Sequence, residues 1–215
     1  NVPLAALNRE GRARGTIADH MDLKVRLEQA DLSILPLLTG EVAWATGETK
    51  GEITIGGTLA QPLLNGSVVV KDGTVKLKAL AEPIQKVGVD IQFEDDKINV
   101  IAFDGSMGGG AYRLTGTAAL NGLALADYRM LLVLDKLGIN HKYFKGPLQG
   151  TFTLDSNGGK PVLSGSLVFN NTTINVPFVP EFEPTGLDIG LDLEVVAAKK
   201  VRLINPYLYD LIVEG

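Results

Sequence analysis

Residues able to do chemistry are few and scattered in this chain. The glycine-rich segment 105–110 has the composition of a phosphate-binding loop, but it lacks the Gly-Lys-Ser/Thr ending. No helix is expected after it whose N-terminus would hold a phosphate. Its flanks alternate like strands, so we expect a hairpin turn there. Serines such as Ser67 and Ser166 lack the Gly-x-Ser-x-Gly setting of a hydrolase nucleophile.

The titratable residues give no better candidate for a site. His20 and His141 have no second ligand at metal spacing, so we expect surface or loop roles. The carboxylate pairs Asp95-Asp96 and Glu181-Phe182-Glu183 are of a kind that glycosidases and calcium sites use. The first pair falls in an expected hairpin turn and the second in a Pro-rich loop, so solvated charge is the better interpretation. With no cysteine in the chain, thiol chemistry is excluded, and we expect no catalysis, cofactor or metal.

Composition and net charge limit the classes of partner that the chain is expected to bind. The net charge of −5 and the pI of about 5.1 argue against nucleic acid, which requires a basic surface. The most basic region is N-terminal, with Arg12, Arg14, Lys24 and Arg26. We expect an ordinary solvated strand face there, with contact to lipid headgroups as the alternative.

Hydrophobic residues are abundant but spread out. They make up 45% of the chain, and the mean hydropathy is +0.16. No segment approaches the roughly 20 apolar residues of a membrane-spanning helix, and the densest run, Met130–Leu134, ends at Asp135. Two-faced strands would distribute apolar residues in this way, and so would an interior that holds a lipid.

The elements that must position these residues are mostly strands. Short runs such as 87–94 and 149–155 alternate between apolar and polar residues, so each presents one apolar face. Segment 187–193 alternates in the same way, with Asp188 and Asp192 opposite its leucines. One short helix is expected over 29–38, with its length limited by Pro36 and a strand leading into it.

A repeat runs through the chain. Residues 62–77 align without a gap with residues 161–176, at a constant offset of 99. Identical or apolar residues recur at matching positions, whereas polar residues change. The segment 71–74 carries an Asp-Gly pair, Asn170-Asn171 falls in the matching segment of the second copy, and we interpret both as hairpin turns. A long repeat built from strands indicates an elongated all-β body.

The succession of these segments resembles the TamB family, within the AsmA-like group of envelope proteins. The resemblance covers most of the chain, and each of its motifs consists of Gly, Leu and Pro at strand spacing. The segments that carry it are 30–38, Gly40, 51–57, 57–66, 108–116, 161–176 and 201–203.

The resemblance implies a fold and a role. Members of the family are anchored in the inner membrane of two-membraned bacteria, and they extend across the periplasm as a curved β-sheet folded into an apolar trough. They are implicated in phospholipid transport to the outer membrane and, with a barrel partner of the TamA type, in outer-membrane protein assembly. The chain has no anchor of its own, and both of its ends look cut. We therefore expect a C-terminal-side fragment whose anchor to the inner membrane lies outside this chain.

The fold expected is all-β: an elongated, strongly curved, mostly antiparallel sheet forming an apolar-lined, β-taco-like trough, with one short helix. We expect a single body over 1–215, with a first repeat over 57–150 and a truncated second repeat over 151–215. Terminal strands with unpaired edges predict dimers or detergent-dependent behaviour.

One apolar face is the candidate lipid-contacting groove. Its predicted residues share one parity within each run, and the two repeat copies agree. They are Val68, Val70, Val75, Leu77, Val89, Ile91, Phe93, Phe152, Leu154, Leu167, Phe169, Ile174 and Val176. Three alternatives stay open: an ordinary β-sandwich core, a structural or adhesive cell-surface repeat with a dry interior, and a parallel β-helix enzyme.

Overall fold

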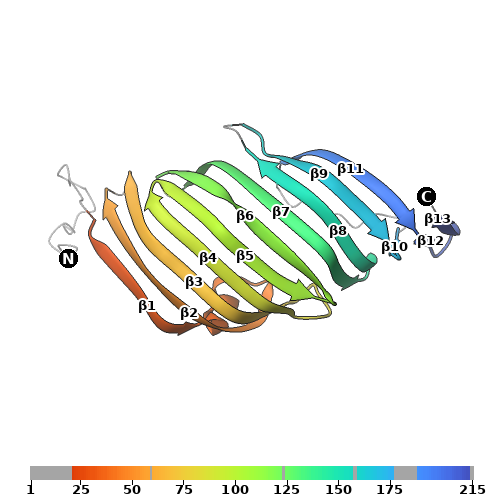
Figure 1. Ribbon diagram of the computed structural model, residues 1–215, viewed down its shortest axis with the longest axis horizontal. Helices are drawn as coiled ribbons and strands as arrows, with labels where there is room; N and C mark the ends of the chain where they lie inside the picture. The colour runs from red at the N-terminus through yellow and green to blue at the C-terminus, as the bar shows by residue number, and fades with distance from the viewer. Residues whose placement is uncertain (1–20, 59, 123, 157–158, 177–187, 214–215) are drawn as a thin grey trace, which may run out of the picture.

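The computed structural model describes residues 21–58, 60–122, 124–156, 159–176 and 188–213. Thirteen strands in these residues form one curved sheet (Figure 1). The strands are β1 (Leu23–Asp31), β2 (Val42–Gly57), β3 (Pro62–Leu77), β4 (Ile84–Asp95), β5 (Lys97–Met107), β6 (Gly110–Asn121), β7 (Ala124–His141), β8 (Phe144–Asp155), β9 (Val162–Asn170), β10 (Thr173–Asn175), β11 (Gly190–Lys199), β12 (Val201–Asn205) and β13 (Tyr209–Val213).

Most of the sheet is an antiparallel meander. Each strand from β1 to β8 pairs with the next one in sequence. The far edge of β8 is shared, because β9 pairs with most of its length and β10 with its first residues. Strand β11 then pairs in parallel with β9, and β12 in parallel with β10. The predicted curved and mostly antiparallel sheet is therefore confirmed, with one parallel segment added.

The interpretation of Asp72-Gly73 and Asn170-Asn171 as hairpin turns is wrong. Strand β3 runs straight through Asp72, which has a φ of 50°. Asn171, at the matching place in the second copy, has a φ of 53° and joins β9 to β10. Asp and Asn tolerate the left-handed conformation, which serves an in-strand bulge as well as a two-residue turn. Each repeat copy is therefore one bent strand.

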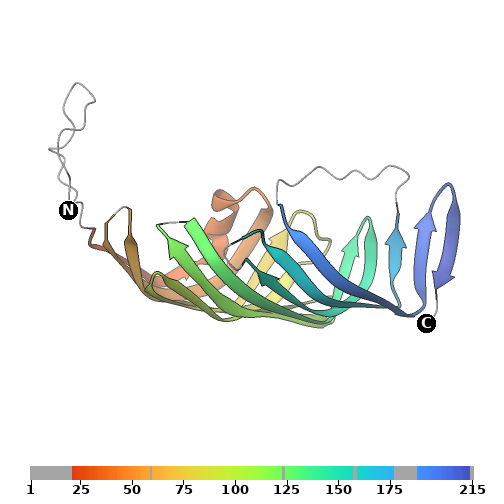
Figure 2. The same cartoon turned by 90° about the horizontal axis from the view of Figure 1, so that it is seen from above.

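These two residues belong to a row that crosses the sheet. Lys86 in β4, Lys136 in β7 and Lys200 between β11 and β12 also have φ values near 50°. Strand register shifts at or beside each of these positions. A bulge bends its strand and increases the local twist. The row therefore folds the whole sheet along one line, which we call the crease, and Figure 2 shows the resulting trough.

The crease is also where the packing is tightest. The residue that follows each left-handed residue is buried: Gly73, Val87, Leu137, Thr172 and Val201. Met107, Leu134, Leu137 and Phe152 form a hydrophobic cluster there, with exposed fractions of 9% or less. Much of the tightest packing among the described residues thus lies near the bend.

One short helical segment lies on the concave side of the sheet (Figure 2). It consists of the 3₁₀ helix η2 (Leu32–Ile34) and the helix α1 (Leu35–Leu38), so the predicted helix is confirmed except that residues 29–31 end β1. Asp31 begins it by accepting a hydrogen bond from the Ser33 amide at 2.6 Å. A Cβ added at Gly47 or Gly73 would lie 3.2 or 3.1 Å from the Leu32 Cδ1 methyl group, so these two glycines make room for it.

Other turn predictions are confirmed. Gly108 and Gly109, with φ values of 58° and 85°, close the β5–β6 hairpin, so the glycine-rich segment is a turn that leads into a strand. Asp95-Asp96 joins β4 to β5, and Asn121-Gly122 begins the turn from β6 to β7. The nucleotide-binding interpretation of the glycine cluster therefore has no structural basis.

Two alternative architectures are excluded for the described residues. All thirteen strands belong to one sheet, so no second sheet covers the first as in a sandwich. The antiparallel meander is likewise unlike the coils of a parallel β-helix. The proposed repeat boundary between residues 150 and 151 falls inside β8, so both repeats share this sheet. Among the described residues, no helix has the length and apolarity needed to cross a membrane.

Candidate functional site

Strand register places the predicted lining on one face of the sheet. Partners in a strand pair point to the same side. One row of partners runs from β3 to β11 as Val70, Val89, Phe103, Leu114, Leu132, Phe152, Gly165 and Leu193. Other predicted residues before the crease lie on the same side by alternation: Val68 opposite Ile91, Phe93 opposite Gly66, Leu154 opposite Leu163, Leu167 opposite Gly150 and Phe169 opposite Leu148.

The predicted residues beyond the crease continue this face. Val75 pairs with Ala45 and Leu77 with Val42, both of which are buried. In the second copy Ile174 pairs with Phe144, whose ring lies 5.7 Å from that of Phe169 between centroids. Gly73, two residues before Val75, faces Leu32 of the concave-side helix, which identifies the shared face as the concave one.

Exposure separates the predicted residues into two groups. Val70 and Phe152 are buried, at 5% and 8% exposed, and they belong to the packing at the crease. Val176 is 36% exposed, and the other ten are half-buried. A half-buried apolar side chain in a single-layer sheet keeps surface available to a ligand. The accessible part of the candidate groove is therefore these eleven side chains rather than all thirteen.

The concave face is uncharged before the crease. In the paired segments from β2 to β11, its positions hold aliphatic, aromatic, glycine, methionine and a few neutral polar residues, and the carboxylate of Asp95 occurs only at the β4–β5 turn. Sequence reasoning missed several members of this face: Leu23, Val25, Ile53, Ile55, Val100, Phe103, Leu114, Met130, Leu132, Leu163 and Leu193.

The convex face carries the charges. Arg129 pairs with Asp155 on the neighbouring strand, at 2.6 Å between Nη2 and Oδ2, and Arg113 lies 3.3 Å from Asp104. Threonines and serines, most of them half-buried, fill many positions between them. Leu131 and Val133 interrupt this polar surface, at 41% and 40% exposed. The sheet thus has one apolar and one largely polar side, which matches the predicted pattern of alternation.

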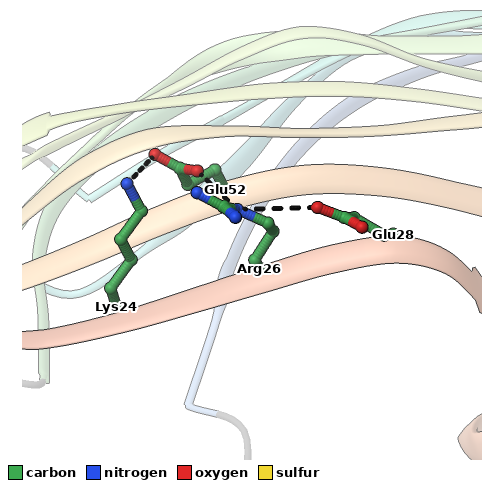
Figure 3. Close-up of polar contacts among 4 residues, drawn as sticks. All are labelled: Lys24, Arg26, Glu28 and Glu52. Carbon is green, nitrogen blue, oxygen red and sulfur yellow. Dashed lines mark hydrogen bonds and ion pairs between the residues drawn. The ribbon is translucent and has the colours of Figure 1, made fainter.

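The densest group of ion pairs lies on β1 and β2 (Figure 3). Glu52 accepts both Lys24, at 2.6 Å, and Arg26, at 2.9 Å, and Arg26 also lies 3.7 Å from Glu28. The hydrogen bond from Lys24, followed by the one from Arg26, lowers the pKa of Glu52. All four groups are solvated, so they form the exposed strand face expected for Lys24 and Arg26 and contribute little to stability.

The residues singled out for chemistry remain dispersed. His141 accepts a long hydrogen bond from the Tyr143 amide at 3.4 Å and contacts the ring of that residue. Asp95 accepts from the Asn65 side chain at 3.0 Å. Within the described ranges, no group of three or more His, Asp or Glu residues has the arrangement of a metal site. His20, Glu181 and Glu183 lie outside the described residues.

Surface hollows do not coincide with the predicted groove. One hollow of about 550 Å³ is open and lies beside the Arg129–Asp155 pair, lined by residues such as Lys97, Asn99 and Tyr128. It contains none of the thirteen predicted residues. The concave face is thus an open surface of the trough rather than an enclosed pocket.

Comparisons with known proteins add no further constraint. No protein-family model matches the chain, and no curated protein or solved structure is similar to it.

Proposed function

We propose that this chain is a non-enzymatic, lipid-conducting segment of a TamB-like protein and that its concave face holds phospholipid acyl chains. The observation that supports this proposal is the uncharged apolar face that continues across nine strands, on a sheet that no second layer covers. A sheet normally buries such a face against another layer. Here acyl chains would provide the missing cover.

The energetics suit a carrier rather than a selective binding site. Burying one CH₂ group is worth about 0.8 kcal/mol, irrespective of which methylene it is. A row of Val, Leu, Ile and Phe side chains therefore attracts an acyl chain along its whole length without a deep local minimum. Among the described residues, charged groups that would fix one headgroup are missing from this face before the crease, apart from Asp95 at the β4–β5 turn, so lipids could move along it.

The cellular setting of this proposal follows from the resemblance alone. It places the chain in the periplasm, between an inner-membrane anchor outside this chain and an outer-membrane barrel of the TamA type. In that setting phospholipid would move between the two membranes, and the same protein could support outer-membrane protein assembly.

The decisive measurement is native mass spectrometry of the purified chain for copurified phospholipid. A photoreactive phenylalanine derivative at Phe93, on the concave face, should cross-link to phospholipid, whereas the same derivative at Val133, on the convex face, should not. Absence of lipid from both experiments would refute the proposal.

Paired substitutions test the face itself. The double variant Ile91→Asp and Phe169→Asp should reduce lipid binding and transport while far-UV circular dichroism stays unchanged. The matched control Leu131→Asp and Val133→Asp adds the same charges to the convex face and should leave lipid binding intact. Equal lipid binding in the two double variants would contradict the assignment of the concave face.

A structural or adhesive repeat is the alternative function. It requires the concave face to be dry and covered, with no lipid after purification. The exposed fractions of Val176 and of the half-buried groove residues favour the lipid-conducting function instead.

A further inference from the structure

Two strands form unpaired edges of the sheet before the crease. Among the described residues, β1 pairs only with β2, and β11 pairs only with β9. Both edges also expose apolar side chains, with Leu23 54% and Leu191 71% exposed. An exposed strand edge with apolar side chains is a template for pairing with another strand.

The two edges match each other in direction. Strands alternate from β1 to β9, and β11 runs parallel to β9, so β1 and β11 point the same way. Placing one copy beside another in the same orientation therefore brings β11 of the first against β1 of the second as a parallel pair. Parallel pairing is already the mode by which β11 joins β9.

The side chains match in one register. When Leu191 faces Leu23, the concave positions bring Leu193 against Val25 and Val195 against Leu27. All of these are apolar, and Val195 is 56% exposed. The apolar face of one trough thereby continues into that of the next.

The same register is complementary in charge on the convex side. Asp192 faces Lys24, and Glu194 faces Arg26. Asp192 and Glu194 have no ion pair among the described residues, whereas Lys24 and Arg26 both contact Glu52 and Arg26 also lies 3.7 Å from Glu28 (Figure 3). Pairing β11 with a second β11 would instead bring these carboxylates against each other. Charge complementarity of this kind sets partner choice and register.

We infer that copies of this chain associate head to tail, with β11 of one copy pairing in parallel with β1 of the next. Such a contact joins two different surfaces, so it generates chains or rings of copies rather than two-fold dimers. The inference rests on the sheet edges and is independent of the proposed lipid function.

Charge reversal tests the contact. Light scattering should show that the mass of the wild-type chain rises with concentration at low salt and falls at high salt. Lys24→Glu with Arg26→Glu should weaken association at least about tenfold, and so should Asp192→Lys with Glu194→Lys. Mixing the two variants restores opposite charges at each contact and should restore association. The control Lys78→Glu with Lys145→Glu makes the same charge change as the first pair, in the turn after β3 and within β8, away from both edges, and should associate normally.

Cysteine pairing tests the register, because the native chain has no cysteine. A mixture of the Leu23→Cys and Leu191→Cys variants should form a mixed disulfide under oxidation faster than either variant alone forms a homodimer. A wild-type chain that stays monomeric at all concentrations would overturn the inference. So would preferential Leu23→Cys homodimers, which would indicate two-fold pairing of β1 with β1, or a mixture of charge variants that fails to associate.

Discussion

Gly165 offers a sharp test of the trough, because its backbone has a conformation that other residues rarely adopt. It faces Phe152 and Leu193 on the concave side and has a φ of +139°. The equivalent glycine of the first copy, Gly66, has a φ of +133°. A Cβ added at Gly165 would lie 2.1 Å from the Thr151 carbonyl oxygen. The repeat thus preserves glycine at this position for a backbone reason.

The cost of Gly165→Ala can be built from these facts. Holding a non-glycine residue at such a φ costs about 1–3 kcal/mol. Moving the β8 carbonyl away weakens a ladder hydrogen bond, for a further loss of about 1 kcal/mol. The lower entropy of the unfolded alanine variant returns roughly 0.4–1 kcal/mol. We therefore expect the free energy of unfolding to fall by about 2–3 kcal/mol, a large share of the ~5–15 kcal/mol typical of a native protein.

Urea unfolding followed by far-UV circular dichroism measures this loss. Gly56→Ala is the matched control, because Gly56 also lies in a strand and its added Cβ would have only the Met21 carbonyl oxygen nearby, at 3.9 Å. The control should keep or slightly raise stability. Gly66→Ala should behave like Gly165→Ala, since its Cβ would lie 1.9 Å from the backbone carbonyl oxygen of Glu52. If all three variants unfold at the same urea concentration, the positive-φ backbone conformation of Gly66 and Gly165 is refuted.

Two more perturbations probe the crease and its surroundings. Burial, with a smaller effect of Asp104, raises the pKa of Tyr112 from 10.0 to about 12. The neutral phenol is favoured in the folded state, so its contribution is complete below pH ~10 and is lost as the pH rises to ~12. Because the phenol is partly exposed, solvent screening reduces this loss to about 1–2 kcal/mol. Tyr112→Phe should remove this alkaline loss in urea unfolding at pH 9 and pH 11.5, and an equal loss in the variant would exclude Tyr112 as its source. At Lys136, with a φ of 49°, Lys136→Gly should be neutral or stabilising by up to ~1 kcal/mol, whereas Lys136→Val should cost about 1–3 kcal/mol. Equal stability of the two Lys136 variants in urea would show that the strand has no left-handed residue there.

The faces of the sheet were predictable because the side-chain period of a strand is two. Runs such as 87–94 alternate cleanly, so parity alone placed Val89, Ile91 and Phe93 together. The comparison of repeat copies extended the same face to Leu167 and Phe169 without any knowledge of strand pairing. The prediction of the lining therefore depended on a local property of the chain, and register preserved it.

Other residues of the concave face could not be predicted, because the runs that contain them do not alternate between apolar and polar residues. The segment Met130–Leu134 is apolar throughout, yet β7 directs Met130, Leu132 and Leu134 to the concave side and leaves Leu131 and Val133 on the convex side. Parity within the segment carries no signal when both faces are apolar. Only pairing with β6 and β8 decides which residues line the trough.

The residues of the crease were wrongly predicted to form hairpin turns, and the reason is different. An Asp-Gly or Asn-Asn pair indicates a left-handed residue, and the chain can use that conformation to reverse direction or to bend within a strand. The choice depends on whether the neighbouring strands continue past the same point. Here β2 and β4 continue beside Asp72, so a bulge preserves their pairing where a hairpin would end it.

A row of bulges at matching positions explains how one sheet acquires the shape of a trough. A single bulge bends one strand, and its neighbours resist the bend because their ladders would break. When β3, β4, β7 and the β9–β10 and β11–β12 connections carry a left-handed residue on one line, these parts of the sheet can bend together while the pairing on either side continues. The packing gained at the crease, around Phe152 and Leu137, then stabilises the bend locally.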